Sequence, residues 1–281
     1  MSENPNVITK GHGYNPIDPE VINERVNNYS NSAALGKVFG IAAIGVLITA
    51  ALTMVLGYFM VEFLLNTETT DLELYGNVWI VYIVMLVVAF IGVMIIPYLV
   101  QRSARKGGVK ALWAQFIIYA ILFGVFLSSF AFVLSPIMIG MAFAVSALIF
   151  AVMALIGILT KGKLKVLAQI AIGLGFGILV VGAFAFLIFA TSLFVPLFAG
   201  EPGTLYAWNE TVQWIFFGLM TLIFIFTCIT TIMQVNSIKK AAQQYQLQKS
   251  EVLFFGFMMF SNYTIMLMYV LRILAIFARR K

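Results

Sequence analysis

Polar side chains recur at helical spacing in the last two apolar stretches of this 281-residue chain. The first stretch carries four of them at i, i+3, i+4 and i+7, which is one helical face: Thr227, Thr230, Thr231 and Gln234. The second carries three on one face: Asn262, Tyr269 and Arg272. Amides and hydroxyls exchange hydrogen bonds but do not titrate near neutral pH. Buried polar groups in lipid need partners, so we expect both faces to point into a helix bundle, toward each other or toward water.

Each of these side chains also has a purely structural interpretation. Threonines in apolar helices bond to the carbonyl four residues before them, and amides join neighbouring helices with about 0.6 kcal/mol per bond. For the threonines alone we favour this interpretation. Arg272 is the only charged residue well inside a span. It either extends to the outer interface or serves the interior, and the sequence leaves both open.

The sequence contains few residues that could form a catalytic or metal-binding site. The chain has one histidine, His12, which lies in the polar tail, and one cysteine, Cys228, which lies inside an apolar run, so we expect neither a zinc site made of such ligands nor a Ser–His or Cys–His arrangement. Three acidic residues follow Glu73, and none is near the middle of a span: Glu201, Glu210 and Glu251. We therefore predict no enzyme, no cofactor, no bound metal and no carboxylate relay for protons across the bilayer.

Closely spaced glycines suggest a nucleotide loop at first sight. Gly173, Gly175 and Gly177 lie inside an apolar span, however, where close helix packing is the better prediction. Gly36 and Gly40 form another pair with small-residue spacing and receive the same interpretation.

The elements that position these residues follow from composition. Hydrophobic residues make up 62% of the chain and charged residues 10%, with a mean hydropathy of +1.03. A soluble domain is about 45–50% apolar, so the lipid bilayer must be the solvent for most of this chain. The apolar runs are continuous, which predicts helices. The net charge of +6 does not indicate nucleic-acid binding, because the basic residues lie in short loops between spans.

The sequence predicts an all-α bundle of seven transmembrane helices. Residues 1–33 are an Asn-rich polar tail, which we expect to be disordered and cytoplasmic. Residues 34–281 form a single transmembrane domain. Its predicted spans are Val38–Val61, Val78–Val100, Leu112–Leu134, Ile137–Leu159, Val166–Ala190, Val212–Met233 and Val252–Phe277. Only Ser135 and Pro136 join the third span to the fourth, which predicts a tight hairpin.

Charge sets the orientation of the predicted bundle. The tail and the second, fourth and sixth loops carry the basic residues, whereas the first, third and fifth loops carry none, and acidic residues lie in the first and fifth. The positive-inside rule then puts the N-terminus in the cytoplasm. Arg279, Arg280 and Lys281 would lie outside after seven crossings, against the rule. We expect the last segment to cross fully despite them, because earlier spans dominate.

Several segments, taken in order, resemble the Bax inhibitor family, also called the transmembrane Bax inhibitor motif family. The first span reads LGKVFGIAAIGVLITAAL, and residues 116–129 read FIIYAILFGVFLSS. Residues 142–164 read AFAVSALIFAVMALIGILTKGKL, and residues 269–277, near the end of the chain, read YVLRILAIF. The resemblance runs from about residue 35 to the C-terminus.

The resemblance implies six helices around a central, C-terminal seventh, and a calcium leak governed by pH. It further implies a latch of two buried aspartates on the last two helices, assisted by a basic residue near the second helix. The motifs IMQVNSIK and YVLRIL align the two aspartate positions with Gln234 and Asn262. Because of this resemblance, we interpret Gln234 and Asn262 as functional positions. Arg102 is the candidate basic residue. Amides cannot titrate and coordinate calcium more weakly than carboxylates, so the pH switch and the calcium selectivity are both in question here.

We expect a passive cation leak channel, for Ca²⁺ or other cations, that lacks the pH latch and resides in a bacterial plasma membrane. The alternative is a non-conducting membrane protein that binds and modulates other membrane proteins through its small-residue faces and its polar tail. A small-solute exporter is less favoured, because no span carries a central carboxylate and no internal repeat is evident.

Overall fold

A computed structural model describes residues 19–63, 72–106, 108–160, 164–199, 204–244 and 247–278 of the chain. The secondary structure of this part is helical, with short turns between the helices. Its elements are α1 (Pro19–Val61), α2 (Leu72–Arg105), α3 (Val109–Ser128), the short 3-10 helix η2 (Ser129–Phe132), α4 (Pro136–Leu159), α5 (Lys165–Ala199), α6 (Thr204–Gln244) and α7 (Lys249–Ala278). Seven of these helices are long and apolar enough to cross a membrane, as the sequence predicts.

The first helix begins earlier than the sequence analysis expects. Residues 19–33 are the start of α1 rather than a disordered tail, while residues 1–18 lie outside the described residues. Proline is favoured in the first turn of a helix, where its missing N–H has no partner to lose. Pro19 occupies that position, and no proline or glycine interrupts the chain from there to Gly36.

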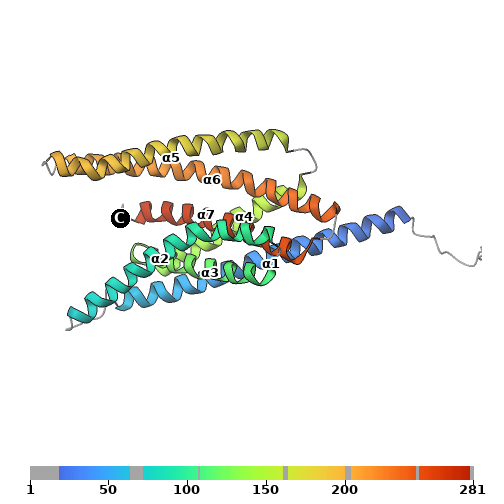
Figure 1. Ribbon diagram of the computed structural model, residues 1–281, viewed down its shortest axis with the longest axis horizontal. Coiled ribbons are helices and arrows are strands. Elements are labelled where there is room, and N and C mark those ends of the chain that lie inside the picture. Colours follow the sequence, from blue (N-terminus) through green and yellow to red (C-terminus); the bar gives the residue numbers. More distant parts are fainter. Residues whose placement is uncertain are drawn as a thin grey trace, which may run out of the picture.

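Successive helices run in opposite directions, so their ends fall on two opposite sides (Figure 1). The side where α3, α5 and α7 begin carries the basic residues of these helix ends: Arg102, Arg105, Lys106, Lys110, Lys165, Lys239, Lys240 and Lys249. α7 begins on this basic side and ends on the other, and its 30 residues are long enough for a full crossing.

The connection between α3 and α4 is the tight hairpin that the sequence predicts. η2 continues α3 by one turn, and Ser135 then caps α4 by accepting a hydrogen bond of 3.4 Å from the backbone N–H of Met138. Pro136 follows in the first helical position. A serine cap with proline directly after it is a common start for a helix.

α7 is the most buried of the seven helices and packs against α1, α2, α3, α4 and α6. Its Phe260 is fully buried and meets Phe116 and Tyr119 of α3 edge-on, with ring centroids 5.6 and 5.7 Å apart. α5 differs from the other helices, because within the described residues it packs against α6 and lies on the outside of the bundle (Figure 1). The last helix therefore lies at the centre of five of the other six helices.

Glycines mark the closest helix contacts, but not at the positions that the sequence suggested. A Cβ atom added at Gly173 or Gly177 would have no atom within 4 Å, so neither supports close packing. Gly36 and Gly40 are open in the same way. Close approach occurs instead at Gly157 of α4, where an added Cβ would lie 2.8 Å from the backbone oxygen of Ile232 on α6.

Candidate functional site

An amide and hydroxyl cluster joins α6 to α7 within the bundle. The side-chain Nδ2 of Asn262 donates two hydrogen bonds, one of 2.8 Å to Oε1 of Gln234 and one of 3.0 Å to Oγ1 of Thr231. Thr231 is fully buried and Asn262 is 9% exposed. The two faces that the sequence predicts to meet therefore do meet, and these three side chains form the hydrogen-bonded part of the contact.

The threonines of α6 use their own protons inside the helix. Thr227 donates to the carbonyl of Ile223 at 2.8 Å, and Thr231 donates to the carbonyl of Thr227 at 2.7 Å. Thr230 donates to the same carbonyl at 3.0 Å. Such bonds satisfy a hydroxyl within its own helix. The oxygen of Thr231 keeps a free lone pair, and this is where Asn262 donates.

Aromatic contacts hold α6 and α7 together farther from the basic side. The ring of Tyr269 stacks on Phe224 with centroids 4.4 Å apart, and also on Phe217 at 6.3 Å. Its hydroxyl lies 3.3 Å from that of Thr221. These contacts fix the position of α7 along α6, and with it the contact between Asn262 and Gln234.

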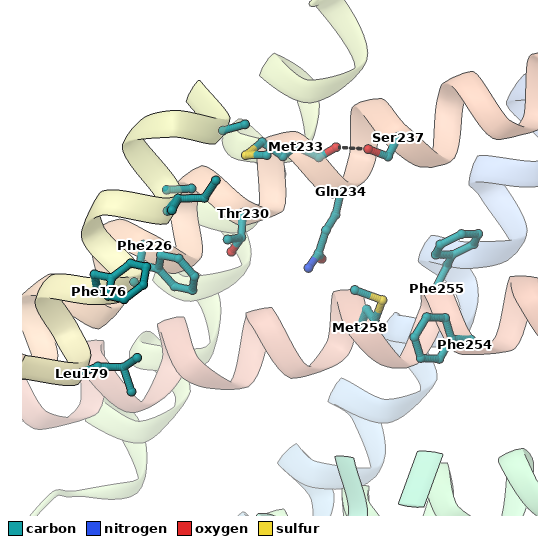
Figure 2. Close-up of a pocket in the computed structure, with 14 residues that line it drawn as sticks. Phe176, Leu179, Phe226, Thr230, Met233, Gln234, Ser237, Phe254, Phe255 and Met258 are labelled. Carbon is teal, nitrogen blue, oxygen red and sulfur yellow. Dashed lines mark hydrogen bonds between the residues drawn. The ribbon is translucent and has the colours of Figure 1, made fainter. Parts of the chain in front are cut away.

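Gln234 also faces a cavity of about 710 Å³ that lies along α5, α6 and α7. Figure 2 shows its side chain extending from α6 toward α7, above Met258 and between the aromatic residues at the two ends of the cavity. Among the described residues its Nε2 makes no hydrogen bond. The amide of Gln234 is therefore the boundary between the buried cluster and this open space.

Chemically, the cluster is neutral at any physiological pH. Asn262, Gln234 and Thr231 can donate and accept hydrogen bonds, and none of them gains or loses a proton there. Amide oxygens are calcium ligands, but weaker ones than carboxylates. The part of the chain that the structure describes holds no group of three or more His, Cys, Asp or Glu side chains suited to a metal ion.

The two arginines of the prediction lie apart from the cluster. Arg102 is exposed in the last turn of α2, on the basic side. Arg272 is partly buried, ten residues beyond Asn262 toward the far end of α7. Neither bonds to Gln234 or Asn262 among the described residues, so the roles assigned to both arginines stay predictions.

The sequence of the chain matches one family model. The sequence model described as "Inhibitor of apoptosis-promoting Bax1" matches residues 31–279, which is most of the chain. The chain belongs to the Bax inhibitor family. Comparisons with curated proteins and with solved structures found no match.

In this Bax inhibitor family member, several buried polar residues were not predicted from the sequence, and one of them caps the end of a helix. Asn236 of α6 donates from Nδ2 to the carbonyls of Thr160 at 2.7 Å and Gly157 at 3.3 Å, at the end of α4. Lys239 donates to the carbonyl of Ile158 at 2.7 Å. These bonds satisfy carbonyls that the end of a helix leaves without partners. An asparagine two residues after Gln234 was the available signal, since it faces the opposite side of α6.

Proposed function

We propose that this Bax inhibitor family membrane protein is a passive cation leak channel whose conduction does not depend on a titrating latch. The observation that carries the proposal is the 2.8 Å hydrogen bond between Asn262 and Gln234, the two positions that align with the family's latch aspartates. An amide pair makes this contact at every pH, whereas two carboxylates make it only while they share a proton.

The cluster also supports a weak preference among cations. Its oxygens belong to neutral groups, so a divalent ion would gain less there than from carboxylates. We propose that Ca²⁺ passes without strong selection over other cations. The protein acts by conduction and not by catalysis, since its cluster offers no pair of a nucleophile and a base.

Calcium flux into liposomes tests the proposal. The purified protein is reconstituted in vesicles that contain a calcium-sensitive dye, and entry is measured at acidic and alkaline pH against empty vesicles. The expected result is a leak of similar rate at both values. A steep pH dependence would show that another group controls closure, and an absence of flux in all conditions would remove the channel.

A second candidate function is to bind and modulate other membrane proteins without conducting ions. One observation favours it: the hydrogen-bond partners of Asn262 are the neutral Thr231 and Gln234, which is also how ordinary interhelical contacts are made. Crosslinking in native membranes separates the two functions. A stable partner together with no flux supports the second one.

We propose a bacterial plasma membrane as the location, with the N-terminus in the cytoplasm. The basic side of the bundle, where Lys110, Lys240 and Lys249 lie, would then face inward according to the positive-inside rule. Reporter enzymes that are active on only one side of the membrane, fused to either end of the chain, test this. An N-terminal fusion active outside the cell would overturn it.

A further inference from the structure

The cavity beside Gln234 is a long groove open to the surrounding bilayer. Residues of three helices line it: Ala168 to Leu179 of α5, Phe226 to Ser237 of α6 and Phe254 to Met258 of α7 (Figure 2). Its outer wall is α5, on which Phe176 is 67% and Leu179 is 70% exposed. The groove is thus reached sideways from the lipid.

The lining of the groove is almost entirely hydrocarbon. Its polar residues are Thr230, Gln234 and Ser237, all on α6. Thr230 and Ser237 each donate to a carbonyl of their own helix, at 3.0 and 2.8 Å. A polar solute would find one available amide there, whereas an alkyl chain would find contact along the whole length.

The groove has the length of one leaflet. Phe226 and Ser237 are 11 residues apart on α6, which corresponds to about 16 Å along the helix. The hydrocarbon core of a bilayer is about 30 Å thick. The groove therefore extends from the basic side of the protein to roughly the middle of the membrane, which is the depth that an acyl chain reaches.

Positive charge lies at the end of the groove where a headgroup would be. Lys240 is exposed one turn beyond Ser237 on the same face of α6, and Lys249 is exposed at the start of α7. α5 itself begins at Lys165. The acidic Glu251 is also near, but its carboxylate accepts a hydrogen bond from the backbone N–H of Gln248 at 2.9 Å. Basic pockets between membrane helices suit anionic lipid headgroups.

We propose that this groove binds one anionic phospholipid from the leaflet on the basic side. One acyl chain lies along α5, α6 and α7 and covers Gln234 from the bilayer. The phosphate lies beside Lys240. This lipid site goes beyond the proposed conduction and does not depend on it.

Native mass spectrometry of the full-length protein tests the site. The protein is released from nanodiscs that contain equal amounts of phosphatidylglycerol and phosphatidylcholine with identical chains. We expect one retained phosphatidylglycerol on the wild-type protein. The change Gly175→Phe should lower its occupancy by about tenfold or more, because a side chain at Gly175 enters the groove near Phe226, 3.7 Å from the added Cβ.

Gly177→Phe is the matched control. This glycine lies on the opposite face of α5 with no atom within 4 Å of an added Cβ, so the same bulk should leave the lipid bound. Ala168→Phe, at the end of the groove toward the basic side, provides a second block if Gly175→Phe does not fold. Lys240→Gln should reduce the preference for phosphatidylglycerol, whereas Lys110→Gln, exposed on α3, should not.

Three results would overturn the proposal. The first is equal retention of the two lipids by the wild-type protein. The second is unchanged occupancy in folded Gly175→Phe and Ala168→Phe. The third is a wild-type dimer that Gly175→Phe separates, which would make a second copy of the chain the occupant of the groove.

Discussion

Asn262 on α7 donates a hydrogen bond of 2.8 Å to the side-chain oxygen of Gln234 on α6. These residues are 28 positions apart in the chain and belong to antiparallel neighbours. Asn262 is nearly enclosed, while Gln234 faces the groove. The contact therefore links the most buried helix to the open side of the bundle through groups that do not titrate.

Two adjacent threonines should differ in their contribution to stability. Thr231→Val removes an acceptor from buried Asn262 and should lower the free energy of unfolding by about 1 kcal/mol. Thr230→Val removes only a bond within α6 and should be close to neutral. Thermal unfolding of both variants in the same detergent measures the difference. Equal losses would mean that Asn262 does not depend on Thr231.

The coupling between the two amides should be measurable. A double-mutant cycle of Gln234→Ala and Asn262→Ala should give an interaction energy of about 0.6 kcal/mol, the average for hydrogen bonds between membrane helices. Unfolding of the four proteins in denaturant gives this energy. Strictly additive losses would show that the two side chains do not bond in the bilayer protein.

Gly157 should tolerate no larger side chain. Gly157→Ala would place a Cβ 2.8 Å from the backbone oxygen of Ile232 and 2.9 Å from Cβ of Val235, so α4 and α6 must separate. We expect a loss of about 1–3 kcal/mol, as for other overpacked sites. Gly173→Ala, in the open, should be neutral or slightly stabilising. Melting temperatures compare the two, and equal values would contradict the close approach.

The end of α4 should depend on Asn236. Asn236→Ala leaves the carbonyls of Gly157 and Thr160 without this buried donor and should cost about 1–3 kcal/mol. Its neighbour Ser237 bonds only to its own helix, so Ser237→Ala should change little. Hydrogen exchange at the end of α4 gives a local measurement. Unchanged protection there in Asn236→Ala would rule out the capping role.

The spans and the cluster were predictable because a lipid environment allows few backbone structures. A continuous apolar run of more than 20 residues must become a helix, and polar groups inside it must find partners. Thr231, Gln234 and Asn262 share this requirement, and spacing alone put them on two faces. The pairing of Gln234 with Asn262 in particular came from the family's motifs.

The position of α5 was not predictable on the same grounds. Its residues are apolar on every face, and lipid solvates such a helix as well as protein does, so periodicity does not say what it packs against. The contact of Gly157 with Ile232 was hidden for a related reason. A glycine in a span indicates close packing only when the facing helix is known. Gly173 and Gly177 also lie in an apolar span, but no other helix approaches them closely.

The central claim is that the amide pair keeps the α6–α7 contact independent of pH. The direct test compares calcium flux from acidic to alkaline pH in the wild-type protein and in Gln234→Asp plus Asn262→Asp. Two adjacent carboxyls raise the pKa of one of them, so their contact holds at acidic pH and is lost as pH rises. The single variants, with one carboxyl beside an amide, are the matched controls. We predict a flat profile for the wild type and a pH-dependent one for the double variant, and identical profiles would contradict the claim.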